Sequence, residues 1–305
     1  MKQPIAPAEP RSYYGQPVIK SPVWTPEVPI YFFAGGLAGA SAGLAFAARL
    51  SGNKRLARVA TGNAAAGIAV SPVLLISDLG VRWRFLNMLR VFKLSSPMSI
   101  GSWILAVEGG MVTLAAAHEF LGWFPKPLAR VAEALAALFG MPLATYTAAL
   151  LANTAVPAWH EGRHELPFAF AGGSAMAAGG AAAILTRGEA GAPARRLAIA
   201  GAATEVVAME VMQRRLGKLA EPYRTGAPGR LEKATMAAAG GGGAVLAIAQ
   251  ARRSRPLAVA GSMMTLAGSM LGRWLVFRAG FQSAESPKYT VEPQRARLAN
   301  PQPRV

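Results

Sequence analysis

Residues 28–48 of this 305-residue chain read VPIYFFAGGLAGASAGLAFAA, a run without a single charged side chain. A helix needs about 20 mainly apolar residues to cross the hydrocarbon core of a bilayer. Comparable stretches cover 59–77, 99–119, 134–160, 166–186, 197–213, 234–251 and 256–272; acidic residues interrupt only the second and the fifth of these. Because a helix satisfies its own backbone hydrogen bonds, it is the form that such segments take in lipid. The sequence therefore predicts an all-α integral membrane protein with eight transmembrane helices.

Most of the apolar residues are small, and the 33 glycines fall largely inside these stretches. Gly35, Gly39 and Gly43 recur at steps of four, which places them on one face of the first predicted helix. Gly268 and Gly272 repeat the spacing in the last. Small residues let helices approach closely in lipid, so we expect these glycines to serve packing rather than ligand binding.

The chain has no cysteine and only three histidines. Iron–sulfur ligation and disulfides within the chain are thereby excluded. A b-type haem would normally use two intramembrane histidines, and only His118 lies in a predicted span. His160 and His164 lie in a short connection beside acidic residues, where we expect a solvated turn and no metal site. Any electron chemistry must therefore come from a bound small molecule or from a partner.

The formal net charge is +17, and the basic residues lie mainly in loops and tails. There they set topology and meet lipid headgroups or an acidic partner protein. No basic patch with interleaved aromatic residues indicates nucleic acid. Loop 79–98 alternates basic and apolar residues at helical spacing, which predicts an amphipathic helix in the interface. Its basic residues are candidates for docking a partner: Arg82, Arg84, Arg90 and Lys93.

With eight spans, both termini lie on one side of the membrane. That side, with a polar arm over 1–28 and a polar tail over 281–305, carries about 19 Lys and Arg residues, against about 12 on the other. The positive-inside rule then favours cytoplasmic termini in the cell inner (plasma) membrane. We expect no signal peptide, because the first apolar run is too long for one.

A short sequence repeat links the two halves of the chain. Phe33-Ala34-Gly35-Gly36 in the first predicted span reappears as Phe170-Ala171-Gly172-Gly173 in the fifth. An offset of four spans favours a parallel repeat of two four-helix bundles, over 29–159 and 160–280.

Ionisable side chains in the spans are functional candidates, because hydrocarbon penalises charge. Asp78 closes the second span. Glu108 and Glu119 are eleven residues apart, so they share one helix face about 16 Å apart along the axis, and His118 adjoins the second. These four residues are candidates for proton transfer, although Glu119 and His118 are equally compatible with a plain interfacial position.

Two further features of the spans involve polar side chains. Glu205 and Glu210 in the sixth span, with Arg273 at the end of the eighth, are candidates for an intramembrane ion pair. Tyr146 lies inside the fourth span, where a phenol needs a hydrogen-bond partner.

Several short motifs follow one another across the first four spans. They are WTPEVPIYFFAGG at 24–36, DLG at 78–80 with RF at 84–85, SPMS at 96–99 with GSW at 101–103, and YT at 146–147 with Pro157 and Trp159. Their order and spacing resemble the membrane subunit of the NrfD/polysulfide reductase family. The resemblance covers most of the chain, and in the second half it is carried mainly by hydropathy.

This resemblance implies eight helices in two four-helix bundles. It implies an anchor for a ferredoxin-like iron–sulfur subunit, which itself partners a molybdopterin catalytic subunit. It also implies a quinone, menaquinone or ubiquinone, bound without a covalent link in the first bundle. Carried over by position, the candidates for binding it are Tyr31, Ser99, Trp103 and Tyr146.

Parts of the function stay open at this point. Formate dehydrogenase, polysulfide, thiosulfate and nitrite systems use similar subunits, so the substrate of the catalytic partner is undetermined. Some family members carry a histidine on the first helix beside the quinone, and this chain has none before His118, which leaves the proton donor open. A secondary transporter or proton-translocating module is the alternative; broken helices in both halves would favour it, and Pro142 is the candidate break. A structural anchor without a quinone site is the third possibility.

Overall fold

The computed structural model describes residues 17–299 of the chain. Of the polar arm predicted over 1–28, residues 1–16 lie outside this range, as do residues 300–305 of the predicted tail. Within the described residues the chain is helical, and eight of its helices have 20 residues or more. They are α1 Glu27–Leu50, α2 Lys54–Asp78, α3 Pro97–Leu121, α4 Lys126–Ala152, α6 Leu166–Leu185, α7 Ala192–Leu216, α9 Gly226–Ala251 and α10 Arg255–Glu285.

Six of these helices, α1, α2, α3, α4, α6 and α9, are long and apolar enough to cross a membrane. α7 and α10 are long enough, but their charged residues lower the mean hydropathy. The all-helical, multi-pass membrane character predicted from the sequence is therefore confirmed, whereas the length and composition of α7 and α10 alone do not mark them as spans.

Local sequence signals account for where the helices begin and end. The side chain of Asn53 accepts a hydrogen bond from the Leu56 amide at 3.1 Å and caps α2, a role that asparagine favours. The hydroxyl of Ser96 accepts from the Ser99 amide at 3.4 Å at the start of α3. Gly122 ends that helix with φ 71°, in the left-handed region that glycine adopts freely.

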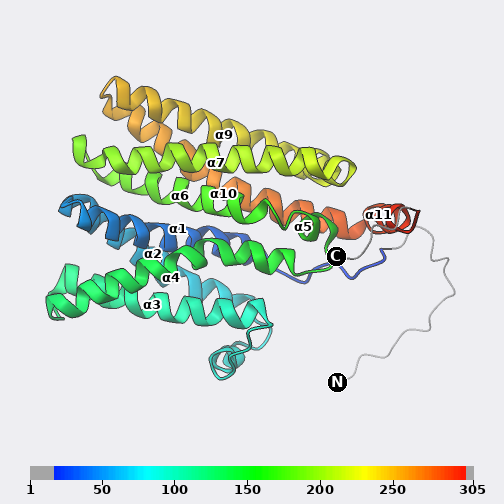
Figure 1. The fold of residues 1–305 in the computed structure, drawn as a ribbon, viewed down its shortest axis with the longest axis horizontal. Coiled ribbons are helices and arrows are strands. Elements are labelled where there is room, and N and C mark those ends of the chain that lie inside the picture. The colour runs from blue at the N-terminus through cyan, green and yellow to red at the C-terminus, as the bar shows by residue number, and fades with distance from the viewer. Residues whose placement is uncertain (1–16, 300–305) are drawn as a thin grey trace.

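The long helices run side by side in two neighbouring groups (Figure 1). In the first half of the chain α1 packs against α2 and α4, and α3 packs against α4. In the second half α6 packs against α7, and α9 against α10. The two halves meet where α6 contacts α1 and α4.

Close approach of the helices depends on glycine at particular positions. A Cβ atom at Gly39 would overlap the backbone of Gly140, and the reverse also holds, so α1 and α4 touch main chain to main chain. Of the other glycines on that face of α1, Gly35 borders the ring of Tyr31 and Gly43 has open space beside it. Of the three glycines for which a packing role was predicted, Gly39 is therefore the one that makes the close helix contact.

Two assemblies of loops close the ends of the helices. One, here called the terminal end, carries residues 17–26, the 3-10 helix η1 Arg82–Leu89, α5 Pro157–Glu161, α8 Glu221–Arg224 and α11 Lys288–Ala299, and both ends of the described chain lie there (Figure 1). The other, the turn end, carries the connections 51–53, 122–125, 186–191 and 252–254.

Three sequence-based boundaries were wrong. The fourth apolar run continues to 160, but α4 ends at Ala152 and a turn separates it from α5. Loop 79–98 is not one amphipathic α-helix, since only Arg82–Leu89 is helical and it is of the 3-10 type. The last long helix does not end before the predicted tail at 281, because α10 continues to Glu285, and α11 follows it.

Candidate functional site

Two tyrosine hydroxyls meet inside the first half of the molecule. Tyr31 lies one turn into α1 and is 1% exposed, and its hydroxyl is hydrogen-bonded to that of Tyr146 on α4. The residues are 115 positions apart in the sequence, so only the packing of α1 on α4 brings them together. The hydrogen-bond partner that the phenol at position 146 requires inside a span is therefore Tyr31.

The hydrogen bond between the two tyrosines leaves one of their two hydroxyl protons without an acceptor. Each phenol carries one O–H donor, and a bond between two hydroxyls uses one of the two. Among the described residues neither hydroxyl has another hydrogen-bond partner. The pair can therefore donate one further hydrogen bond to an acceptor such as a carbonyl oxygen.

α3 holds the ring of Tyr146 in place by lacking a side chain. A Cβ atom at Gly101 would overlap the ring, so glycine is required at this position of α3. The same face of α3 continues with Leu105 and then Glu108, both buried.

Glu108 is the unpaired acid of this region. Its side chain is 0% exposed, and neither carboxylate oxygen has a hydrogen-bond partner among the described residues. Its charge is close enough to act on the hydroxyl of Tyr31. A buried carboxyl without a partner is costly unless it is neutral or meets a ligand or water. Glu108 is therefore a group that can hold and release a proton near the tyrosine pair.

Ser99 and Trp103 do not join the tyrosines. The Ser99 hydroxyl donates to the Val91 carbonyl at 3.0 Å and accepts from the Lys93 amide at 3.1 Å. The Trp103 indole donates to the same Val91 carbonyl at 3.3 Å. Both residues hold the loop after η1 against α3, whereas Gly101 between them faces Tyr146. Of the four candidates for quinone contact, the structure thus brings together only Tyr31 and Tyr146.

The candidate docking residues lie next to this loop. Arg82, Arg84, Arg90 and Lys93 are all exposed at the terminal end. Trp83, in η1, is 87% exposed as well. The terminal end therefore presents a basic surface with an aromatic side chain in it.

An apolar groove of about 580 Å³ lies between α2, α3 and η1. Ile68 and Leu75 of α2 line it, together with Leu105 of α3 and Phe85 of η1. Leu105 also belongs to the face of α3 that carries Gly101 and Glu108. The groove thus lies on α2 and on α3, the helix whose Gly101 contacts the Tyr146 ring, and its lining suits a hydrocarbon chain.

Asp78 anchors the start of α1 rather than facing the tyrosines. Its carboxylate accepts hydrogen bonds from the Thr25 hydroxyl at 2.5 Å and the Thr25 amide at 3.2 Å. Beside it Trp24 stacks on Trp159 with ring centroids 5.2 Å apart. The segment before α1 is thereby fixed to α2 and α5. Neither Thr25 nor Trp24 was a candidate, although both belong to the motif at 24–36.

Glu119 and His118 lie at the turn end, far along α3 from Glu108. Arg49 binds Glu119 at 2.9 Å and Glu133 at 2.6 Å, and His118 shares a 2.5 Å hydrogen bond with the Phe124 carbonyl. Sequence reasoning missed Arg49 and Glu133; the only signal was one isolated charge near an end of each apolar run.

The face of α3 between the two acids is apolar. Val112 and Ala115 separate Glu108 from Glu119, and both are buried. Glu108 and Glu119, the two carboxyls predicted to share this face, therefore have no polar side chain between them on it.

The predicted ion pair in the second half is only partly formed. Glu205 and Arg273 are both buried, and the charge of each acts on the other. The Arg273 guanidinium donates to the Phe170 carbonyl at 2.8 Å and lies 4.0 Å from that ring's centroid. Glu210 does not take part: it is exposed and binds Arg214 at 2.8 Å. Because α7 turns by about 100° per residue, five positions carry Glu210 away from the face that buries Glu205.

Comparison with known proteins places the chain in a family. No curated protein matches it. The family model described as polysulfide reductase (NrfD_2) matches residues 11–286, which include Tyr31, Glu108 and Tyr146. The chain therefore belongs to the NrfD/polysulfide reductase family and is a membrane subunit of the kind found in redox complexes.

Proposed function

We propose that this chain is the quinone-interacting membrane subunit of an oxidoreductase complex, with the quinone headgroup bound at the Tyr31–Tyr146 pair. The observation that carries the proposal is the unused hydroxyl proton of this partly buried pair near an unpaired buried carboxyl, that of Glu108. A quinone presents two carbonyl oxygens to such donors and carries electrons together with protons. Membership of the family supports the proposal.

The chain's own groups fit this ligand in chemistry. Tyr146 or Tyr31 donates a hydrogen bond to a carbonyl oxygen, which favours the reduced and more negative form. Gly101 leaves room for the ring of Tyr146, and the groove along Ile68, Leu75 and Leu105 accepts an isoprenoid chain. Glu108 exchanges protons with the site. Asp78 is the second proton candidate, and its carboxylate is held by Thr25.

The site lies near the basic surface. Tyr31 is four residues into α1, about 6 Å along the helix axis from the terminal end. The exposed basic residues of 82–93 lie at the same end. We propose that a ferredoxin-like iron–sulfur subunit docks there and that a molybdopterin subunit binds in turn to it. A cluster bound against this surface would be separated from the tyrosines by only the first turns of α1 and α3.

The proposal includes the membrane arrangement. In it, all eight long helices cross the bilayer as two four-helix bundles. Arg273 of α10 and Glu205 of α7 are buried within the protein, so neither of these two charges meets lipid, whereas Glu210 of α7 is exposed and paired with Arg214. Both termini lie on the cytoplasmic side, as the charge distribution favours.

The test is purification of the assembled complex in mild detergent, followed by mass spectrometry of its proteins and its lipid-soluble cofactors. Wild type should retain a quinone, an iron–sulfur protein and a molybdopterin protein. Tyr146→Phe should keep the protein partners and lose most of the quinone. Tyr223→Phe is the matched control, because Tyr223 is a buried phenol in the second half that donates to the Ala158 carbonyl at 3.2 Å. Equal quinone retention in both variants would contradict the proposal.

The buried unpaired carboxyl of Glu108 is also what a secondary transporter or proton-translocating module would show. The break expected of a transporter is not found at Pro142, since α4 runs without interruption from Lys126 to Ala152. Recovery of the chain alone, without quinone or partners, would favour this second function.

A further inference from the structure

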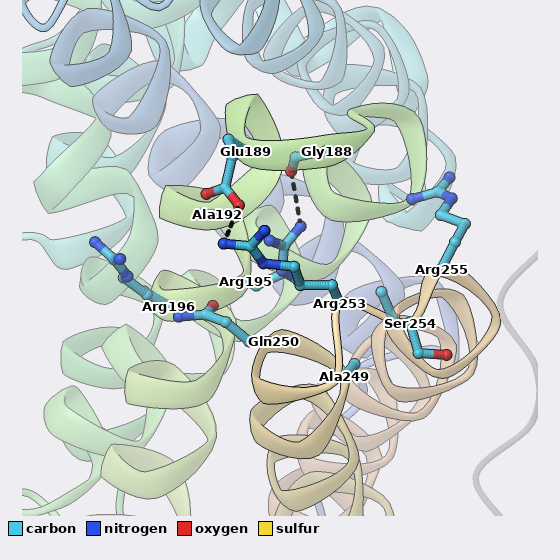
Figure 2. Close-up of a pocket in the computed structure, with 11 residues that line it drawn as sticks. Gly188, Glu189, Ala192, Arg195, Arg196, Ala249, Gln250, Arg253, Ser254 and Arg255 are labelled. Atoms are coloured by element: carbon cyan, nitrogen blue, oxygen red, sulfur yellow. Dashed lines mark hydrogen bonds and ion pairs between the residues drawn. The ribbon is translucent and has the colours of Figure 1, made fainter.

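A pocket of about 350 Å³ at the turn end, far from the tyrosines, is surrounded by positive charge. It lies between the start of α7, the connection before it, and the turn that joins α9 to α10 (Figure 2). Four arginines line it, Arg195, Arg196, Arg253 and Arg255, against a single carboxylate, Glu189. The family-based function gives this pocket no role.

Two helices begin at the pocket. The N-cap of α7 is Gly191 and that of α10 is Ser254, and neither helix start has a side-chain cap. The N-terminus of a helix carries partial positive charge and free N–H groups, which favour anions. The helix starts therefore add to the charge of the arginines instead of offsetting it.

The guanidinium groups are only weakly neutralised. Arg195 donates to the Gly188 carbonyl at 3.3 Å, while its Nε is buried without a partner among the described residues. Arg253 approaches Glu189 at 4.0 Å, and both side chains are more than 80% exposed. Figure 2 shows Arg195 and Arg253 extending from α7 and from the α9–α10 turn toward the same side of the pocket.

The fold holds these arginines close together at a cost. Arg253 has φ 50°, the one described residue other than glycine with positive φ, a conformation that a long side chain adopts only at a cost. Arg255 donates to the Ala183 carbonyl at 2.8 Å and also to that of Ile184, which ties it to the end of α6. Arg196 and Arg255 are close enough for their charges to act on Arg195. Like charges held this close are destabilising unless an anion lies between them.

We propose that this pocket binds a phosphate group, and that its source is the headgroup of an anionic phospholipid. Planar guanidinium groups bind phosphate oxygens through two parallel hydrogen bonds, which makes arginine well suited to this anion. Basic pockets between membrane helices are known lipid-headgroup sites. Leu185 follows Ile184, whose carbonyl accepts from Arg255, and Ile248 precedes the lining residue Ala249. These two side chains are 57% and 46% exposed and provide apolar surface for acyl chains. The inference does not depend on the quinone proposal.

The experiment is native mass spectrometry and thermal unfolding of the purified full chain with three additions: phosphatidylglycerol, phosphatidylcholine and inorganic phosphate. Wild type should retain phosphatidylglycerol and unfold at a higher temperature when it is added, with a much smaller effect of phosphatidylcholine. Arg195→Gln with Arg253→Gln should lower phosphatidylglycerol retention at least fivefold. Arg196→Gln, which changes an exposed side chain, should lower it without affecting the fold.

The matched control is Arg252→Gln. Arg252 lies beside Arg253 at the same end and is exposed, but it does not line the pocket. Without lipid, the variants should unfold at or above the wild-type temperature, because removing a crowded charge relieves repulsion. Stabilisation by inorganic phosphate alone that the double variant abolishes would support the phosphate site and replace the lipid by a soluble source. Equal phosphatidylglycerol retention in the double variant and in Arg252→Gln would overturn the proposal.

Discussion

The Cα atom of Gly101 faces the ring of Tyr146 so closely that a methyl side chain added to it would overlap the ring. α3 therefore sets the orientation of the phenol, and through it the Tyr31–Tyr146 hydrogen bond. A residue without a side chain thus belongs to the candidate site as much as the two tyrosines do.

Gly101→Ala should displace the Tyr146 ring. Overpacking of this kind costs about 1–3 kcal/mol of unfolding free energy, and the shifted hydroxyl should also lower quinone retention. Thermal unfolding and quinone content of the purified complex measure the two effects. Gly110→Ala on the same helix is the control, because position 110 has open space beside it. Unchanged quinone content in Gly101→Ala would mean that the ring's position does not matter for binding.

Arg49 joins three helices at the turn end, since it extends from the last turn of α1 to Glu119 of α3 and Glu133 of α4. Arg49→Gln should destabilise the chain by about 1–3 kcal/mol, because it leaves a buried Glu133 without its partner. Arg49→Gln combined with Glu133→Gln should recover part of the loss. Arg55→Gln, an exposed change at the second residue of α2, should have little effect. If the double variant is no more stable than Arg49→Gln, the contributions of Arg49 and Glu133 to stability are independent of each other.

Much of the fold could be predicted because the length and apolarity of a membrane helix are local properties of the sequence. Each of the eight runs lies largely within a long helix of the structure, including the two interrupted by acidic residues. The boundaries that failed depend on tertiary contacts instead. Loop 79–98 is shaped by hydrogen bonds from Ser99 and Trp103 to the Val91 carbonyl, which no periodicity reveals.

The site was predictable only in part, for a related reason. Spacing tells which residues share a helix face, but not which face meets which neighbour. Tyr31 and Tyr146 were therefore found as separate candidates and not as a pair. Ser99 and Trp103 were grouped with them although their side chains turn to the η1 loop. Gly101 was quoted only as part of a motif, because the need for a missing side chain appears only once the ring beside it is known.

Acid sensitivity should arise at the start of α6. The Arg215 guanidinium, hydrogen-bonded to Glu165 at 2.5 and 2.7 Å, holds the pKa of that carboxyl below its ordinary value of 4.5. A carboxyl with a depressed pKa in the folded state contributes stability above pH 4.5 and loses it as pH falls through the folded-state pKa. The unfolding temperature of wild type should therefore drop more steeply between pH 5 and about pH 3 than that of Glu165→Gln.

The matched control for this pH dependence is Glu285→Gln, which removes an exposed carboxyl at the end of α10. Its pH profile should follow wild type. A Glu165→Gln profile that also coincides with wild type would show that the Arg215 contact contributes nothing to acid stability.

Two alanine substitutions one turn apart on α1 should act in opposite directions. At Gly39 a Cβ would overlap the backbone of Gly140, which cannot rotate away, so Gly39→Ala must separate α1 from α4 and should lower the unfolding free energy by about 2 kcal/mol or more. At Gly43 nothing lies within 4 Å, so Gly43→Ala only raises helix propensity and should stabilise by about 0.5–1 kcal/mol. Thermal unfolding of both variants in one detergent gives the signs directly. Because the changes are chemically identical, equal effects at the two positions would rule out the α1–α4 backbone contact as the packing point of the first half, and with it the approach that brings Tyr31 to Tyr146.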